Sequence, residues 1–326
     1  MDDVIVVFGG SGFIGKQVVR ALAKSGKRVR VPMRRPHLGQ ELRVFGDVGQ
    51  IQLVQANVRY PDSIDRALED ATGVVNLVGV MHNNGQQNFK TLHVEAAEAI
   101  AQAAAKHGVK RMVQISAIGA APKGARYART KFAGEQAVRA ALPSATVLRP
   151  SIVFGPEDSF FNRFAAMARF ASYVPLGGLP SIGGGKTKFQ PIYVGDLAEA
   201  VRAALDRADA QGQTYEIGGP RVYTFKELLR YITVEADRRV PLYPIAFTIA
   251  QPIGLLTEWA FKLNPLMEAP LTSDQVTLLR RDNVVSADAK TIADLGITSL
   301  ESVEAIVPTY LWRFRPYGQF QTKQTA

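Results

Sequence analysis

The chain has 326 residues, of which 47% are hydrophobic and 21% charged, so it is long enough to bury a large core and too apolar for wholesale disorder. It contains no cysteine, which excludes disulfides and thiolate metal sites, and we expect no other metal site. The net charge of +10 favours an anionic partner, namely a phosphorylated cofactor, a membrane surface or an acidic protein, whereas the absence of a dense basic run argues against nucleic acid.

The apolar run Val4–Phe8 begins almost at the initiator Met and has no positively charged leader, so we expect no signal or transit peptide. A bacterial cytoplasmic protein is the simplest interpretation. The longest uncharged stretch is Val240–Thr257. Its three prolines argue against a membrane-spanning helix, although the stretch could lie on a membrane or on a partner protein.

The first half of the chain alternates apolar strand patterns with helical patterns. The expected strands are Val4–Phe8, Arg28–Pro32, Gln52–Gln55, Gly73–Val78, Arg111–Ser116 and Ser144–Arg149. The expected helices are Gly15–Lys24, Ser63–Leu68, His93–His107 and Tyr127–Ala141. Apolar strands separated by helices predict an α/β fold of the Rossmann type, with a doubly wound parallel sheet whose ligands bind beyond the carboxyl ends of the strands.

After Pro150 the pattern is irregular. We expect helices at Phe160–Phe170 and Phe225–Ala236, a glycine-rich loop at Gly177–Lys188, and a short strand and a helix within Pro191–Leu205. The prediction is a Rossmann domain at residues 1–155, with further core elements near 190–220. A smaller C-terminal α/β lobe with an aromatic, basic docking tail would occupy residues 156–326.

Glycines at positions 9, 12 and 15 lie between the first strand and the first helix. This spacing permits a tight turn, close approach of the backbone to a pyrophosphate, and close packing of helix on strand. The helix, which continues through Phe13 and Ile14, would direct its free N–H groups and positive dipole end at the phosphates. The motif therefore predicts a dinucleotide site that includes Gly9, Gly12, Phe13, Ile14 and Gly15.

The end of the second strand distinguishes NAD from NADP. An NAD enzyme usually has an acidic residue here, but this chain reads Met33-Arg34-Arg35. Because a guanidinium binds a 2′-phosphate and a carboxylate would repel it, we expect NADPH, with Arg34 as the first candidate and Arg35 as the second. The alternative is two solvated surface arginines.

The ends of the next strands supply further candidates. Asn57 and Val58 after the third strand could flank the adenine, and Leu77, Val78 and Gly79 after the fourth could line the path of the dinucleotide. Each segment could also be an ordinary strand end.

A possible catalytic set consists of Ser116, Tyr127 and Lys131. Tyr127 and Lys131 are four residues apart on an expected helix and so share one face. The ammonium would lower the pKa of the phenol and could hold the nicotinamide ribose, while Ser116 could bind a substrate oxygen. The same three residues are equally explained as groups that only bind the cofactor.

The sequence resembles the extended short-chain dehydrogenase/reductases over nearly its whole length, through Leu148–Pro156 and Ile192–Ala198. In that family the first of these segments meets the nicotinamide carboxamide, which assigns Pro150 and Val153 to the cofactor site. Within the superfamily, the chain resembles the NADPH-binding accessory subunits of respiratory complex I (NADH:quinone oxidoreductase). That resemblance rests on Gly46–Gln50, Arg126–Lys131, Phe160–Phe164, Pro175–Gly177 and Gln190–Val194.

The resemblance implies a tightly held, structural NADPH and other complex I subunits near the quinone site as partners. It implies a peripheral location on the cytoplasmic face of the bacterial inner membrane, with possible contact to the membrane surface. The segment Ser116–Gly119 lacks the Thr/Asp/Glu set of sugar-nucleotide dehydratases. Two alternatives stay open: a free-standing reductase or epimerase that uses Ser116, Tyr127 and Lys131, and a regulatory NADPH sensor.

Overall fold

A computed structural model describes residues 3–81, 88–262 and 271–320. The chain forms two compact units. The first comprises Met1–Pro150, Val194–Ile217 and Val285–Ser299, and the second comprises Ser151–Tyr193, Gly218–Val284 and Leu300–Ala326.

The first unit is built around a seven-stranded sheet in which every pair of neighbouring strands is parallel. From one edge to the other, the strands are β11 (Thr214–Ile217), β6 (Thr146–Pro150), β5 (Arg111–Ile115), β4 (Gly73–Asn76), β1 (Val4–Phe8), β2 (Arg28–Met33) and β3 (Ile51–Gln55). The chain winds outward from β1 in both directions, so the order reverses between β1 and β4. The predicted Rossmann-type, doubly wound sheet is confirmed, and this reversal is where such sheets bind ligands.

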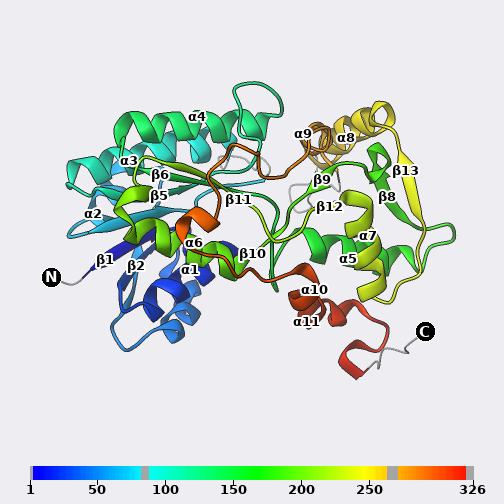
Figure 1. The fold of residues 1–326 in the computed structure, drawn as a ribbon, viewed down its shortest axis with the longest axis horizontal. Helices are drawn as coiled ribbons and strands as arrows, with labels where there is room; N and C mark the ends of the chain where they lie inside the picture. The colour runs from blue at the N-terminus through cyan, green and yellow to red at the C-terminus, as the bar shows by residue number, and fades with distance from the viewer. Residues whose placement is uncertain (1–2, 82–87, 263–270, 321–326) are drawn as a thin grey trace. The chain divides into compact units, whose positions relative to one another are not determined.

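Helices cover both faces of this sheet (Figure 1). One face carries α1 (Phe13–Lys24), α6 (Val194–Asp206) and the 3₁₀ segment η1 (Pro36–Phe45). The other carries α2 (Pro61–Ala67), α3 (Ala96–Lys106), α4 (Arg126–Ala141) and the π-helical turn η2 (Lys90–Glu95) that leads into α3. Coverage of both faces explains why the central strand β1 is apolar throughout.

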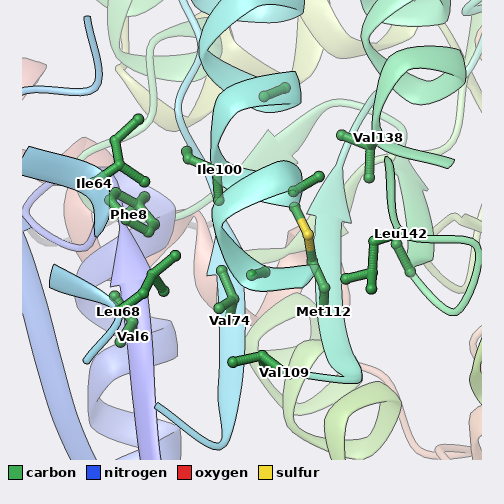
Figure 2. Packing of buried hydrophobic residues seen from close by; sticks show 14 of the residues in the cluster. Val6, Phe8, Ile64, Leu68, Val74, Ile100, Val109, Met112, Val138 and Leu142 are labelled. Atoms are coloured by element: carbon green, nitrogen blue, oxygen red, sulfur yellow. The ribbon is translucent and has the colours of Figure 1, made fainter. Parts of the chain in front are cut away.

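Figure 2 shows the core between the sheet and the second group of helices. Phe8 on β1 and Met112 on β5 point from the sheet toward Ile64, Ile100 and Val138 on the helices, and all five are fully buried or nearly so. Burial of each such side chain contributes roughly 1.5–3 kcal/mol. The carboxyl ends of the strands are therefore held on a rigid base.

Some predicted boundaries differ from the observed ones. The strand expected at Gly73–Val78 ends at Asn76, because the Asn76 side chain accepts the N–H of Val78 and turns the chain. The helix expected at His93–His107 instead begins as a π-helical turn at Lys90. The seventh strand, β11, lies within the region near 190–220 where further core elements were expected, but it was not predicted as a strand, because its four residues include the charged Glu216.

The second unit contains α5 (Phe160–Ala171), α7 (Phe225–Glu235) and three two-stranded pairs. These pairs are β7 (Val153–Phe154) with β10 (Ile192–Tyr193), β9 (Lys188–Phe189) with β12 (Tyr223–Thr224), and β8 (Leu179–Ile182) with β13 (Leu242–Ile245). Aromatic rings fill much of the core, where Phe161 and Phe225 are buried and Phe160 packs edge-on against both. Thr224 and Glu227 form a capping box that fixes the start of α7.

One expectation for this unit was wrong. The stretch Gly177–Lys188 is not simply a loop, since it contains β8, which pairs with β13. Part of the stretch Val240–Thr257 belongs to a helix, α8 (Phe247–Lys262), which continues through Pro252. Within the part of the chain described here, no helix is both long and apolar enough to span a bilayer.

Short helices complete the chain. They are α9 (Ser273–Leu278), η5 (Ala293–Leu295), α10 (Val303–Ile306), α11 (Pro308–Leu311), η6 (Trp312–Phe314) and η7 (Gly318–Phe320). The expected docking tail is partly a core element of the second unit, because Tyr310 is buried and Arg315 pairs with the buried Glu235. Tyr317 and Phe320 are exposed.

Candidate cofactor-binding site

The glycine turn connects β1 to α1 as predicted. Gly9 has φ +79°, a left-handed conformation that favours glycine. A Cβ on Gly15 would lie 2.2 Å from the carbonyl oxygen of Gly9, so only glycine allows the helix to approach the turn this closely. Gly12 differs, because it is exposed and its added Cβ would meet nothing nearer than 3.4 Å. The backbone at Gly12 is therefore open to a ligand.

Gly12 is the N-cap of α1, and no side chain caps this helix end. Phe13 and Ile14 form its first turn and are half-buried, and the first turn contains no acidic residue. The leading N–H groups of a helix have no partner within the helix. This helix end therefore offers unneutralised N–H donors and a positive dipole end, which suit a phosphate.

The turn lies against the end of β2, because a Cβ on Gly10 would come within 2.7 Å of the Val31 side chain. Arg34 and Arg35 follow β2 directly and are both exposed. In the described chain, neither guanidinium has an ion-pair or hydrogen-bond partner. The β2 end thus presents two unpaired cations beside the glycine turn and no carboxylate.

The segments after β3 and β4 carry the next candidates. An added Cβ on Gly9 would lie 3.1 Å from the backbone of Leu77, so the turns after β1 and β4 converge. Val58 and Val78 are partly buried and pack against the core, and Gly79 is exposed. The backbone N–H of Asn57 donates to Ser63, which fixes the turn after β3.

Ser116 and Lys131 meet at the end of β5. The Lys131 ammonium on α4 donates to the carbonyl of Ile115 at 3.3 Å, immediately before Ser116. It would also lie 3.1 Å from a Cβ on Gly79, which joins this cluster to the segment after β4. The Ser116 hydroxyl is buried and has no hydrogen-bond partner in the described part of the chain.

Burial dominates the electrostatics of this cluster. It lowers the pKa of Lys131 to about 8, although the nearby Glu135 acts in the opposite direction. It raises the pKa of Tyr127 to about 12. The expectation that Lys131 would lower the pKa of Tyr127 was therefore wrong. The ammonium is 5.9 Å from the centre of the Tyr127 ring, and desolvation of the phenolate is the larger effect.

Sequence reasoning missed His93, which lies in η2 and is almost fully buried. Its Nε2 accepts the N–H of Val80 at 3.1 Å, so its Nδ1 carries the proton and donates to Thr130 at 3.0 Å. The ring also packs edge-on against Tyr127. Burial, followed by the charge of Lys131, lowers the pKa of His93 to about 3. A single histidine in an alanine-rich helical pattern gave no signal of this role.

The last two candidates lie in different units. Pro150 ends β6, and its carbonyl accepts the N–H of Ile118 in the first unit. Val153 lies in β7 of the second unit. The structure thus brings together the glycine turn, the β2 end, the turn after β4 and the Ser116–Lys131 cluster, all at the carboxyl ends of the strands.

This arrangement fits a phosphorylated dinucleotide. The open backbone at Gly12 and the start of α1 suit a pyrophosphate, and the arginines after β2 suit a further phosphate. The unpartnered hydroxyl of Ser116 and the buried ammonium of Lys131 suit hydroxyl groups of a ribose. The residues present therefore match the donor set that such a ligand needs.

Comparisons with known proteins agree with this geometry. The sequence profile of the NAD dependent epimerase/dehydratase family matches residues 5–218. A UDP-glucose 4-epimerase from Thermotoga maritima has a similar fold, with a TM-score of 0.68 and 18% identity, and the match covers 95% of this chain and 98% of that one.

Closer relatives share much more of the sequence. NADH dehydrogenase (ubiquinone) 1 alpha subcomplex subunit 9 of Arabidopsis thaliana, a mitochondrial protein, is 36% identical over 90% of this chain and 74% of its own length. The rat protein of the same name is 35% identical over 95% of this chain and 81% of its own length. The chain therefore belongs to the NAD dependent epimerase/dehydratase family and, within it, to the family of NADH dehydrogenase (ubiquinone) 1 alpha subcomplex subunit 9.

Proposed function

We propose that this chain is an accessory subunit of respiratory complex I that holds NADPH as a structural ligand. The observation that carries the proposal is the similarity to the subunit 9 proteins, which extends through both units rather than over the Rossmann part alone. A shared nucleotide fold would explain likeness in the first unit only. Likeness in the second unit supports a shared place in an assembly.

When bound, NADPH would supply a pyrophosphate, two riboses and a 2′-phosphate for the protein to hold. The backbone from Gly12 to Ile14 binds the pyrophosphate, and Arg34, with Arg35 beside it, binds the 2′-phosphate. Ser116, Tyr127 and Lys131 bind and orient the nicotinamide end. A ligand that binds only the folded state stabilises that state by mass action, which is how a structural cofactor acts.

A second candidate function is a free-standing reductase or epimerase. It is favoured by the presence of Ser116 and Lys131 at one strand end with Tyr127 on the same helix. The pKa of Tyr127 argues against it, because burial raises that pKa to about 12 and so leaves almost none of the phenolate that would act as a base at neutral pH. Replacing Tyr127 by Phe separates the two functions. A structural subunit keeps its place in the complex, whereas an enzyme loses nearly all turnover.

The proposed location is the cytoplasmic face of the bacterial inner membrane, where the chain would bind the complex beside its quinone-reducing part. The test is native electrophoresis of detergent-solubilised membranes, followed by identification of the nucleotide released from the isolated band. We expect the chain to migrate with NADH dehydrogenase activity and to release NADPH. A chain found only as a free protein would contradict the proposal.

The nucleotide preference has its own test in Arg34→Ala. Loss of a charge-assisted contact to the 2′-phosphate should weaken NADPH binding by roughly ten- to a hundredfold. NADH binding, measured by the same fluorescence titration, should not change. Arg43→Ala removes an exposed arginine on η1 and serves as the matched control. Equal affinities of the native protein for NADPH and NADH would show that Arg34 is only a surface residue.

A further inference from the structure

The turn after α5 exposes a dense group of large apolar side chains. Phe170, Tyr173 and Leu176 are 73%, 74% and 91% exposed, and Val174 between them is also exposed. Isolated exposed apolar residues are ordinary, but a contiguous group marks a surface that is covered in the working state. We call residues Phe170–Leu176 the apolar turn.

Leu176, at the tip of the apolar turn, has φ +58°. The left-handed region is costly for a branched side chain and is kept only where the surroundings impose it. Here the Tyr243 hydroxyl donates to the carbonyl of Leu176 at 2.9 Å. Gly177, which follows, lies so close to the carbonyl of Ala171 that a Cβ would come within 2.2 Å of it. The protein thus holds an exposed leucine in a strained conformation.

The base of the apolar turn is also fixed. The Arg238 guanidinium lies 5.5 Å from the centre of the Tyr173 ring and 3.4 Å from the Ser172 hydroxyl. It also donates to the carbonyl of Phe314. Because the turn is held in place at both ends, its side chains need little further ordering to bind a partner.

An open groove of about 420 Å³ lies next to the apolar turn. Phe170 and Ala171 belong to both features, and the rest of the groove is largely apolar. Its lining residues are Arg163, Ala166, Met167, Phe170, Ala171 and Gly178. A projecting turn beside a groove forms a shaped surface, with the aromatic, methionine and arginine side chains that are enriched in the cores of protein interfaces.

The segment of the chain that forms the apolar turn and lines the groove carries charge of one sign. From Ser159 to Gly195 the sequence contains Arg163, Arg169, Lys186 and Lys188 but no aspartate or glutamate. A complementary partner would therefore carry carboxylates around its apolar contact residues.

We propose that the apolar turn and the adjoining groove dock a protein subunit of the assembly, one that presents apolar side chains flanked by carboxylates. The inference rests on the proposed membership of the chain in that assembly. The shaped groove and the fixed, strained leucine favour a protein partner over a lipid surface, which has no fixed shape to match.

Leu176→Gly tests this docking surface directly. Glycine adopts positive φ without strain, so the isolated variant should melt at the same temperature as the native protein or at a higher one. For the measurement, each form is expressed at a limiting level in a strain that lacks the native chain. Removal of the leucine side chain should reduce by roughly tenfold the fraction of the protein that migrates with NADH dehydrogenase activity. Leu176→Asn, which also tolerates positive φ, should behave in the same way.

Val48→Gly is the matched control, because Val48 is fully exposed in the first unit and should not affect incorporation. If Leu176→Gly migrates with the complex as well as the native chain does, the docking proposal is wrong and the function stands. If the native chain itself never migrates with the complex, both proposals fail. Binding of the native protein to phosphatidylglycerol vesicles, lost in Leu176→Gly, would assign the surface to the membrane and overturn the docking proposal.

Discussion

The hydroxyl of Tyr310 donates a hydrogen bond of 2.6 Å to the buried carboxylate of Asp158, which lies 152 residues earlier in the chain. Asp158 also accepts the backbone N–H groups of Gly155 and Phe161, and so fixes the turn between β7 and α5. Burial raises the pKa of Asp158, while these hydrogen bonds oppose the rise. One carboxylate therefore joins the C-terminal helices of the second unit to the start of α5.

Tyr310→Phe should destabilise the second unit. The ring still fills its place, but the buried carboxylate loses a donor, which costs roughly 1–3 kcal/mol. Urea unfolding followed by circular dichroism measures the change as a lower midpoint. Tyr60→Phe removes the hydroxyl of an exposed tyrosine and should leave the midpoint unchanged. Equal midpoints for both variants would show that the Tyr310 hydroxyl contributes nothing.

Two glycines of the first turn should respond differently to substitution by alanine. At Gly15 the new methyl group would collide with the backbone of Gly9 and Gly10, so Gly15→Ala should lower stability by roughly 1–3 kcal/mol. At Gly12 the methyl group fits within the protein but occupies the space proposed for the pyrophosphate. Gly12→Ala should therefore keep its melting temperature and lose NADPH binding. Unimpaired binding by Gly12→Ala would place the pyrophosphate elsewhere.

Local patterns made much of the first unit predictable. Some elements depend only on residues that are neighbours in the sequence, so their pattern can be recognised there. These elements are the glycine turn, α1 and the apolar strands β1, β4 and β5. The strands β8 and β11 depend on pairing with distant segments. In β11, Glu216 interrupts the apolar pattern, and only the fold places it 3.9 Å from Arg149. Such compensation cannot be read from a short segment.

The candidate site shows the same limit. The sequence indicated Ser116, Tyr127 and Lys131 from their spacing, but not the depth at which they lie. Burial makes the pKa shift of Tyr127 upward rather than downward as expected, because desolvation of the phenolate outweighs the charge of Lys131. Likewise, nothing in the sequence paired His93 with the backbone of Val80, since that contact depends on how η2 packs against the segment after β4.

An ion network at the opposite end of the sheet should make stability depend on acid pH. Burial raises the pKa of Asp3, but hydrogen bonds from Arg111, Lys27 and Thr72 bring it far below its usual value. A carboxyl whose pKa is depressed in the folded state stabilises the protein above its unfolded pKa of about 4, and this contribution is lost as the pH falls further. Asp3→Asn should therefore lower the melting temperature at pH 7.

The difference between native and Asp3→Asn melting temperatures should shrink below pH 4. The exposed Asp288 provides the control, and Asp288→Asn should follow the native protein at every pH. If the melting temperatures of the native protein and Asp3→Asn differ by the same amount from pH 7 to pH 3, the network stabilises the protein through packing and neutral hydrogen bonds rather than through the charge of Asp3.

Lys131 should stabilise the complex with NADPH but destabilise the protein without nucleotide. Its side chain is 7% exposed and donates to the Ile115 carbonyl, and burial lowers its pKa from 10.5 to about 8. Below pH 8 the folded protein therefore carries a buried charge, at a cost of up to roughly 3 kcal/mol. Lys131→Met keeps the length of the side chain and removes the charge. Without nucleotide it should melt at a higher temperature than the native protein, and it should bind NADPH more weakly.

The pH dependence provides the decisive check on Lys131. Between pH 8 and 10.5 the unfolded chain binds more protons at this lysine than the folded chain does, so the stability contributed by this residue rises with pH across that window. The stability of Lys131→Met should lack this rise with pH. The higher melting temperature of the variant, relative to the native protein, should therefore disappear toward pH 10.5. Thermal melts at several pH values, with and without NADPH, measure both effects. A variant less stable than the native protein at pH 7 without nucleotide would show that the ammonium is satisfied by the protein alone, which removes the reason to assign Lys131 to the cofactor.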